Sequence, residues 1–231
     1  PATIHKLILS CDFRNLGSID ALNAGCGYGG TMFALQSVLG GRWRGVTVSR
    51  SQHRIGLRTA RERNLTEIVT FAHQSFDAPR PGNYNFIVAI ESLIHSTDPT
   101  HTVCNLAQSL RPGGLMIVVD DMPDVKIPDA AANDLTAFRK LWRCPVMASA
   151  EDFASAFRAS DCDVIETHDL SDLMRPRSEP EISQALLEVA GRRRWRDRFG
   201  LRRVGEAEIG GLLLERLGRE RAVRYTMMVV Q

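Results

Sequence analysis

Short apolar runs alternate with amphipathic segments through the first half of the chain. The apolar runs are nearly continuous, as in strands of a parallel sheet that is covered on both faces. Apolar residues at helical spacing predict helices between them. Strands are predicted at 18–24, 43–48, 68–72, 84–90 and 115–119, and helices at 31–39, 51–63 and 99–110. This alternation predicts a parallel sheet with right-handed crossovers.

The second half of the chain is less regular. The segment 123–128 is predicted as a loop. Further helices are predicted at 130–143, 150–160, 181–198 and 206–219, and strands at 163–168 and 222–230. Two segments, 129–142 and 170–218, are additions to a bare alternating sheet. We expect them to form a small helical lid that excludes water and shapes a substrate pocket.

A glycine-rich loop follows the first predicted strand directly. It is Gly25-Cys-Gly-Tyr-Gly-Gly30, which matches the GxGxxG pattern of dinucleotide-binding turns. Glycines here let backbone N–H groups approach a ligand closely. A nicotinamide cofactor calls for an acidic residue about 20 positions later, but no Asp or Glu occurs from residue 21 to residue 61. Arg50 and Arg54 would suit a 2′-phosphate, so an NADP-dependent oxidoreductase is one alternative.

Two segments together resemble the class I S-adenosylmethionine-dependent methyltransferases. The run Ala21-Leu-Asn-Ala-Gly-Cys-Gly-Tyr-Gly-Gly30 resembles their first motif, and Leu110-Arg-Pro-Gly-Gly-Leu115 resembles their turn before the fifth strand. The resemblance implies a Rossmann-like, seven-stranded, mostly parallel sheet with helices on both faces, and S-adenosyl-L-methionine as the cofactor. It divides the single domain into a cofactor-binding half (1–121), lid and substrate-shaping insertions (122–221) and a final strand (222–231).

The same resemblance implies which residues hold the cofactor. Thr47-Val-Ser49 and Gln52 stand where most of the superfamily has a ribose-binding acid, and this pattern is similar to cyclopropane fatty acid synthases, geranyl diphosphate C-methyltransferases and sugar O-methyltransferases. Ser49 could instead cap the following helix. Asn23 replaces the usual Asp and keeps its shape without its charge. The implied cofactor-binding residues are Asn23, Gly25, Cys26, Gly27, Gly29, Thr47, Val48, Ser49, Gln52, Gln74, Ser75, Phe76 and Ile90.

The segment Ile90-Glu-Ser-Leu-Ile-His95 carries candidate catalytic residues. Resemblance to the geranyl diphosphate C-methyltransferases makes Glu91 a base that removes a proton from a carbocation, and C-methylation of a prenyl diphosphate or terpenoid is our main interpretation. Resemblance to the sugar O-methyltransferases makes His95 the base, assisted by Asp120 or Asp121. The alternative is therefore O-methylation of a glycosylated or polyketide natural product. A non-methylating cyclase on the same fold is a second alternative.

Composition constrains the partners of this chain. The 231 residues are 44% hydrophobic and 24% charged, which fits one globular domain, and a net charge of +2 gives no argument for nucleic acid. No apolar run approaches the roughly 18 residues that a membrane span needs. Five cysteines without CxxC spacing are typical of a reducing compartment, so we expect a cytoplasmic enzyme for a small-molecule substrate.

Metal binding, assembly and several further points stay open. No His or Cys spacing indicates a metal site, and Mg²⁺ is expected only with a diphosphate substrate. Seven arginines between Arg192 and Arg203 could bind an anionic substrate group such as a diphosphate, attract nucleic acid or membrane phosphate, or form the solvated face of a helix, which is the favoured interpretation. The substrate, the methylated atom, a homo-oligomeric state and an N-terminal helix over the cofactor are not decided by the sequence.

Overall fold

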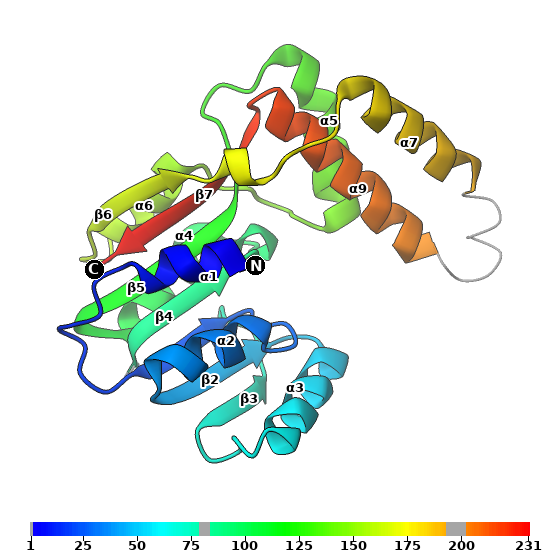
Figure 1. Ribbon diagram of the computed structural model, residues 1–231. Helices are drawn as coiled ribbons and strands as arrows, with labels where there is room; N and C mark the ends of the chain where they lie inside the picture. Colours follow the sequence, from blue (N-terminus) through cyan, green and yellow to red (C-terminus); the bar gives the residue numbers. More distant parts are fainter. Residues whose placement is uncertain (1, 79–83, 193–201) are drawn as a thin grey trace.

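The computed structural model describes residues 2–78, 84–192 and 202–231. One seven-stranded sheet runs through the molecule in the order β3-β2-β1-β4-β5-β7-β6 (Figure 1). All strands except β7 point the same way, and β7 lies antiparallel between β5 and β6. The strands are β1 (Asp20–Ala24), β2 (Arg42–Thr47), β3 (Val69–His73), β4 (Tyr84–Ile90), β5 (Leu110–Pro123), β6 (Val164–Asp169) and β7 (Val223–Val230). The predicted Rossmann-like sheet is confirmed.

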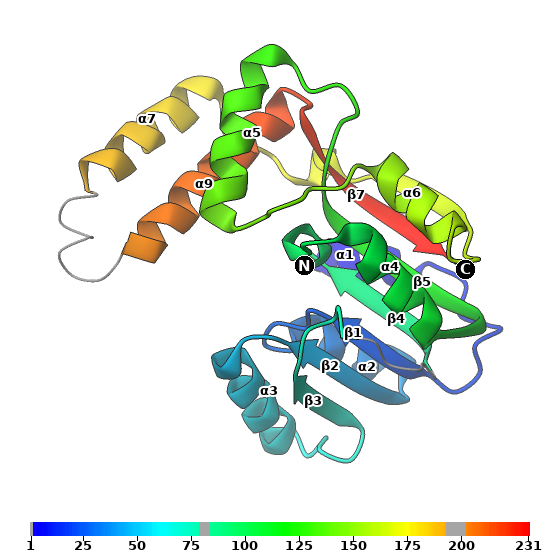
Figure 2. The ribbon, with the colours of Figure 1, turned by 180° about the vertical axis from the view of Figure 1, so that it is seen from behind.

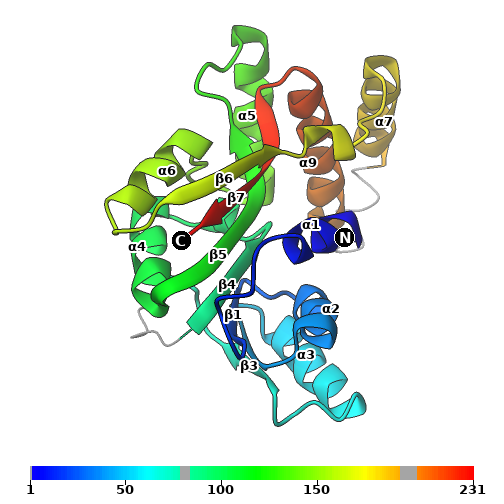
Figure 3. The ribbon, with the colours of Figure 1, turned by 60° about the vertical axis from the view of Figure 1, so that its left-hand side comes forward.

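Helices cover both faces of this sheet, as Figure 3 shows from the side. On one face, α1 (Ala2–Leu9), α2 (Gly30–Leu39) and α3 (Arg50–Glu62) enclose a core around Trp43. On the other, α4 (Pro99–Ser109) and α6 (Ala150–Arg158) enclose a core around Phe157. Because both faces are buried, β4 and β5 contain continuous apolar runs at 86–90 and 115–119, which is the pattern that the sequence shows.

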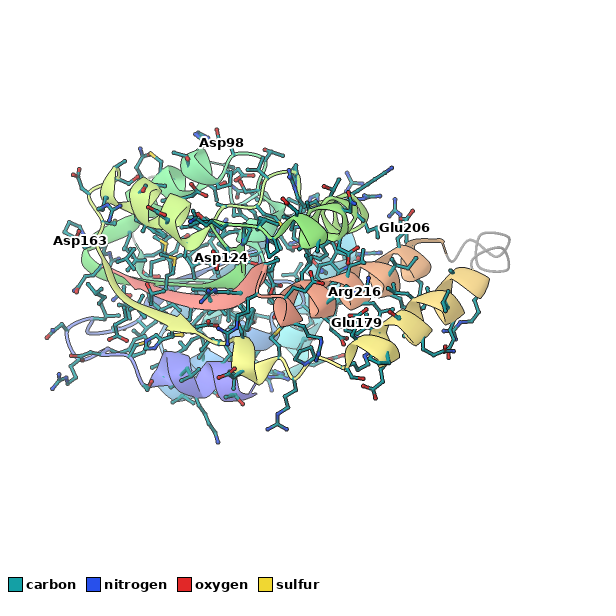
Figure 4. The ribbon with its side chains drawn as sticks, turned by 90° about the horizontal axis from the view of Figure 1, so that it is seen from above. Asp98, Asp124, Asp163, Glu179, Glu206 and Arg216 are labelled. Atoms are coloured by element: carbon teal, nitrogen blue, oxygen red, sulfur yellow. The ribbon has the colours of Figure 1, made fainter. Side chains whose placement is uncertain are left out.

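Three further helices lie beyond one end of the sheet, in the segments predicted to form a lid, and are called the lid below (Figures 1 and 2). They are α5 (Asp129–Trp142), α7 (Glu179–Gly191) and α9 (Arg202–Arg219). The lid has its own apolar core, in which Phe138 and Leu217 are fully buried. Arg216 on α9 joins the three helices, because it pairs with Asp134 of α5 at 3.1 Å and with Glu179 of α7 at 2.8 Å (Figure 4).

The structure changes some predicted boundaries. The range 122–221 combines the lid with α6 and β6, which belong to the sheet because α6 packs on α4 and β6 pairs with β7. The strand predicted at 115–119 is β5, which starts earlier and ends later. The helix predicted at 181–198 is α7, which begins at Glu179 and ends at Gly191. Most of the arginine cluster lies in 193–201, outside the described residues.

Helix α1 has no counterpart in the sequence prediction. Its eight residues are too few for a clear helical period, and a helix this short depends on packing for its stability. The packing is present, since Ile8 is fully buried in the core beside α2. This helix contributes to the cavity described next.

Candidate active site

A cavity of about 800 Å³ opens at the carboxyl ends of β1, β2 and β4. In sheets of this type, ligands bind at the carboxyl ends of the strands, where the loops diverge. The volume is in the range of small-molecule and cofactor sites. The lining residues come from the glycine loop, the ends of β2 and β4, and helix α1: Ile4, His5, Asn23, Gly25, Cys26, Gly27, Tyr28, Gly30, Thr31, Thr47, Val48, Gln52, Phe76, Ile90, Glu91, Ser92 and His95.

The glycine loop has the backbone that its sequence predicts. Gly25 has a φ of 76°, and a Cβ there would lie 2.3 Å from the Cβ of Ser92. Gly27 also has a positive φ, of 54°, but its Cβ position has no neighbour within 4 Å. Gly25 is therefore required by the close approach of Ser92, and Gly27 by its backbone conformation alone. Gly30 and Thr31 begin α2 at the cavity wall, where a helix N-terminus favours a carboxylate or another anion.

The end of β2 presents uncharged polar groups to the cavity. The Thr47 hydroxyl donates to Oε1 of Gln52 at 2.7 Å, and both residues line the cavity. Ser49 does not line it. Its hydroxyl accepts from the backbone N–H of Gln52 at 3.4 Å, so Ser49 is the N-cap of α3. The alternative interpretation of Ser49 as a cap is the one that fits its place in the structure.

Three other predicted residues also lie outside the cavity lining. Gly29 caps α2, and a Cβ there would lie 2.5 Å from the Phe71 ring, so packing accounts for this glycine. The Ser75 hydroxyl is engaged with Asp77 at 3.1 Å. Gln74 keeps a buried Oε1 that has no partner within the described residues, although its neighbour Phe76 does line the cavity. A buried acceptor without a donor is costly.

Asp120 holds the turn that carries the candidate bases. Its Oδ2 accepts from the N–H groups of Ser92 at 3.1 Å and Ile94 at 3.0 Å, while the Ser92 hydroxyl donates to the carbonyl of Ala24 at 2.8 Å. Burial raises the pKa of Asp120 to about 7, although these N–H groups oppose the shift. Asp120 thus fixes the short helix η1 (Leu93–His95) against β5.

Glu91 stands at the cavity in a strained conformation. Its φ of 50° is in the left-handed region, which is uncommon for residues other than glycine and is found most often at functional sites. Its Oε1 accepts a hydrogen bond from the Tyr225 hydroxyl at 2.8 Å. Burial, and then the charge of Glu91, raise the pKa of Tyr225, so the phenol stays protonated and keeps donating. The Glu91 carboxylate is held by the last strand of the sheet.

His95 lines the same cavity but has a different partner. Its Nδ1 lies 3.8 Å from Sγ of Cys144, which is fully buried. Burial raises the pKa of Cys144 to about 12, so its sulfur is a neutral thiol. Within the described part of the chain, Nε2 of His95 has no hydrogen-bond partner. An imidazole whose Nδ1–H points to the sulfur has a free Nε2 that can accept a proton.

Asp121 lies on the other face of β5 from Asp120. Neighbouring residues of a strand point to opposite faces, so Asp121 faces away from the turn that Asp120 holds. It pairs with Tyr225 across β5 and β7, and lines a separate cavity of about 50 Å³. Burial, followed by the charges of Asp120 and Glu91, raises its pKa to about 8. Of the two candidates for assisting His95, Asp120 is the one that hydrogen-bonds the turn before His95, and assistance by Asp121 stays a prediction.

The structure also adds residues that sequence reasoning missed. His5 of α1 lines the cavity, and its Nε2 lies 3.3 Å from the Thr31 hydroxyl. Burial lowers the pKa of His5, which favours the neutral ring. Tyr28 and Thr31 belong to the glycine motif and could have been found there. Ile4 and His5 could not, because nothing in the sequence connects the first ten residues with the loop.

The part of the chain that the structure describes contains neither a cluster of metal ligands nor a membrane-spanning helix. No group of three or more His, Cys, Asp and Glu side chains in 2–78, 84–192 and 202–231 is arranged to hold a metal ion. In the same ranges, no helix is both long and apolar enough to cross a bilayer.

The sheet order, the glycine loop at its carboxyl edge and the candidate bases after β4 define a methyltransferase of Rossmann-like fold. The family model described as "Methyltransferase domain" matches residues 3–167, and the chain belongs to this family. Over 190 residues, the chain is 30% identical to the O-methyltransferase resE of Aspergillus sclerotiorum, an alignment that covers 73% of this chain and 68% of that protein.

Solved structures confirm the fold. The O-methyltransferase of a trans-AT PKS multienzyme from Brevibacillus brevis, solved with S-adenosyl-L-homocysteine, has a TM-score of 0.76 at 15% identity and covers 99% of this chain and 71% of that chain. Geranyl diphosphate C-methyltransferase from Streptomyces coelicolor A3(2), solved with Mg²⁺, a substrate analogue and S-adenosyl-L-homocysteine, has a TM-score of 0.73 at 16% identity and covers 99% and 75%. At these identities the similarity concerns the fold alone.

Proposed function

We propose that this chain methylates a hydroxyl group of a small natural product, with S-adenosyl-L-methionine as methyl donor and His95 as the general base. The donor fits the cavity, whose glycine loop and helix N-terminus suit its carboxylate and whose uncharged Thr47 and Gln52 suit a ribose diol. When bound, it supplies a methyl group on a positively charged sulfur. The O-methyltransferase relative supports this choice over C-methylation, which was the main interpretation of the sequence.

The observation that carries the proposal is the difference between the two candidate bases. The Glu91 carboxylate already accepts a hydrogen bond from Tyr225 at 2.8 Å, so one of its oxygens is engaged. His95 lines the same cavity, its Nδ1 lies next to a neutral thiol, and its Nε2 has no hydrogen-bond partner within the described residues. A neutral imidazole is the commoner base for a hydroxyl near pH 7.

The residues then have distinct tasks. His95 accepts the hydroxyl proton as the acceptor oxygen forms its bond to the methyl carbon and the carbon–sulfur bond breaks. Glu91 lies in the same cavity, where its carboxylate is held by the Tyr225 hydroxyl. Asp120 positions both residues through the turn at 91–95. Much of the rate comes from positioning, because the reaction needs the oxygen, carbon and sulfur in line.

Turnover with isotopically labelled S-adenosyl-L-methionine tests the proposal. The acceptor panel contains phenols, hydroxylated polyketides and glycosides, with prenyl diphosphates as the competing class. We expect label in a methyl ether, and a loss of turnover of about 100-fold or more in His95→Ala, with unchanged affinity for S-adenosyl-L-homocysteine. Glu91→Gln is the matched variant and should lose less.

Three results would overturn this assignment. Label on carbon of a prenyl diphosphate, lost in Glu91→Gln, would establish C-methylation. Full turnover of His95→Ala on a hydroxyl acceptor would remove His95 as the base. Conversion of an acceptor without consumption of the methyl donor would identify a cyclase.

A further inference from the structure

A second cavity, of about 380 Å³, lies where the lid joins the sheet. One wall is the segment after β6, which contains the short helix η2 (Ser171–Leu173), and the other is the turn between α9 and β7. Four arginines line this cavity against two aspartates. They are Arg175, Arg219, Arg221 and Arg224, with Asp169 and Asp172.

Two of these four guanidinium groups have no counter-charge within the described residues. Arg224 pairs with Asp124 at 2.8 Å and with Asp169 at 3.4 Å. Arg219 donates to the backbone carbonyl of Arg177 at 3.2 Å and interacts with the charges of Glu179 and Glu181. Within the described residues, Arg175 and Arg221 have neither an ion pair nor a hydrogen-bond partner for their side chains. Like charges gathered around one hollow repel each other, so an anion in the cavity would lower the energy of the folded chain.

Two of these arginines stand in turns with a left-handed backbone. Arg175 has a φ of 44° and Arg221 a φ of 56°. Glycine or asparagine adopts this region at lower cost than arginine. Arg143, which ends α5 outside this cavity, has the same φ of 56°, so the case for the cavity rests on where the two turns place their side chains. Each turn brings a guanidinium to the same cavity from a different part of the chain.

We propose that this arginine-lined cavity binds a phosphoryl group of a small molecule. A carboxylate carries one charge and is satisfied by one guanidinium fork, whereas a phosphoryl group carries up to two charges and has three acceptor oxygens for several forks. The volume exceeds that of a single ion and fits a phosphate ester or a diphosphate. Asp172, which also lines the cavity, disfavours a larger polyanion.

The cavity is close to the catalytic side of the sheet. Ser171, Pro176, Gly218 and Val223 line both this cavity and the small one that Asp121 and Tyr225 line. A phosphoryl group here could belong to the methyl acceptor or to a separate ligand. The binding chemistry is the same in both cases, and it does not rest on the proposed O-methylation.

Calorimetric titration of the full chain with inorganic diphosphate tests the site. The variant combines Arg175→Asn and Arg221→Asn, because asparagine tolerates a left-handed backbone while removing the charge. We expect the affinity for diphosphate to fall about tenfold or more, because charge-assisted hydrogen bonds are lost. The control combines Arg61→Gln and Arg158→Gln, which removes two charges from exposed positions on α3 and α6.

Either of two results would overturn the proposal: unchanged binding in the cavity variant, or an equal loss in the control, which would mean general attraction to a basic surface. Titration with S-adenosyl-L-homocysteine separates this outcome from failure of the methyltransferase site, because its affinity should be the same in all three proteins.

Kinetic measurements distinguish the two possible sources of the phosphoryl group, the methyl acceptor and a separate ligand. If the acceptor carries the phosphoryl group, the cavity variant raises KM for a phosphorylated acceptor and leaves KM for its dephosphorylated form unchanged; for a separate ligand, both KM values stay unchanged.

Discussion

Replacing Asp121 with asparagine should stabilise this protein above neutral pH. Asp121 is only 8% exposed and Asp120, beside it on β5, is 1% exposed. Burial raises the pKa of both carboxyls. Backbone N–H groups partly oppose this rise at Asp120, but no backbone N–H group opposes it at Asp121. Burial and the neighbouring charges therefore raise the pKa of Asp121 from 3.8 to about 8. An asparagine keeps the shape and cannot ionise.

The sign and the size of the effect follow from proton linkage. The folded chain holds the Asp121 proton more tightly than the unfolded chain does, so stability is fully present below about pH 4 and is lost as pH rises through about 8. A tenfold change in proton affinity is worth about 1.4 kcal/mol, which gives an upper limit of about 6 kcal/mol. Relaxation around the charge reduces this, and we expect Asp121→Asn to recover about 1–3 kcal/mol at pH 9, the usual cost of one uncompensated buried polar group.

The assay is urea unfolding, followed by tryptophan fluorescence, at pH values from 5 to 9. Wild type should lose stability up to about pH 8 and level off above it. The difference between Asp121→Asn and wild type should be smallest at pH 5, where the folded carboxyl is still protonated, and should be largest at pH 9. Asp163→Asn is the control, because Asp163 is exposed before β6 (Figure 4) and should leave the curve unchanged. Parallel curves for wild type and Asp121→Asn would refute the argument.

Other substitutions test the site and the lid. Tyr225→Phe removes the 2.8 Å hydrogen bond to Glu91 and should lower kcat while leaving the affinity for S-adenosyl-L-homocysteine intact; unchanged kcat would count against this contact. Gly25→Ala places a Cβ 2.3 Å from that of Ser92 at a φ of 76°, so urea unfolding should show a loss of about 2 kcal/mol or more. Arg216→Met removes the ion pairs between the lid helices and should speed hydrogen exchange in α7. If the amides of α7 are as protected in the variant as in wild type, apolar packing alone holds this helix.

The sheet could be predicted because its strands and helices are locally specified. The run at 84–90 is apolar and bounded by polar residues, and the structure places β4 at Tyr84–Ile90. Ser149 with Asp152 forms a capping box, which is a local signal for the start of α6. The extra length of β5 has no such signal, because Leu110-Arg-Pro-Gly-Gly114 is typical of a turn. Pairing with β4 and β7 supplies the hydrogen bonds that extend the strand.

The candidate site was predictable where a motif lies on one loop. The glycine loop, the end of β2 and the turn at 91–95 each occupy a few consecutive residues, and the structure brings them to one cavity. Contacts between distant parts of the chain were not predictable. Tyr225 reaches Glu91 over 134 residues, and Cys144 reaches His95 over 49. No local pattern specifies such pairs, because only the antiparallel β7 and the return from the lid create them.

These distant contacts connect the fold with the choice between the two bases. β7 is the one antiparallel strand in the described sheet, so it alone can bring a side chain near the chain end back to the carboxyl edge. There Tyr225 occupies Glu91, while the segment after α5 brings Cys144 to His95. The segment after α5 and the last strand thus supply the side-chain partners of the two residues that the central motif places. Relatives that have the same Glu-Ser-Leu-x-His segment but another residue at the position of Tyr225 should differ in which residue acts as base. Placing the relative's residue at position 225 of this chain, and tyrosine at the matching position of the relative, would test this dependence.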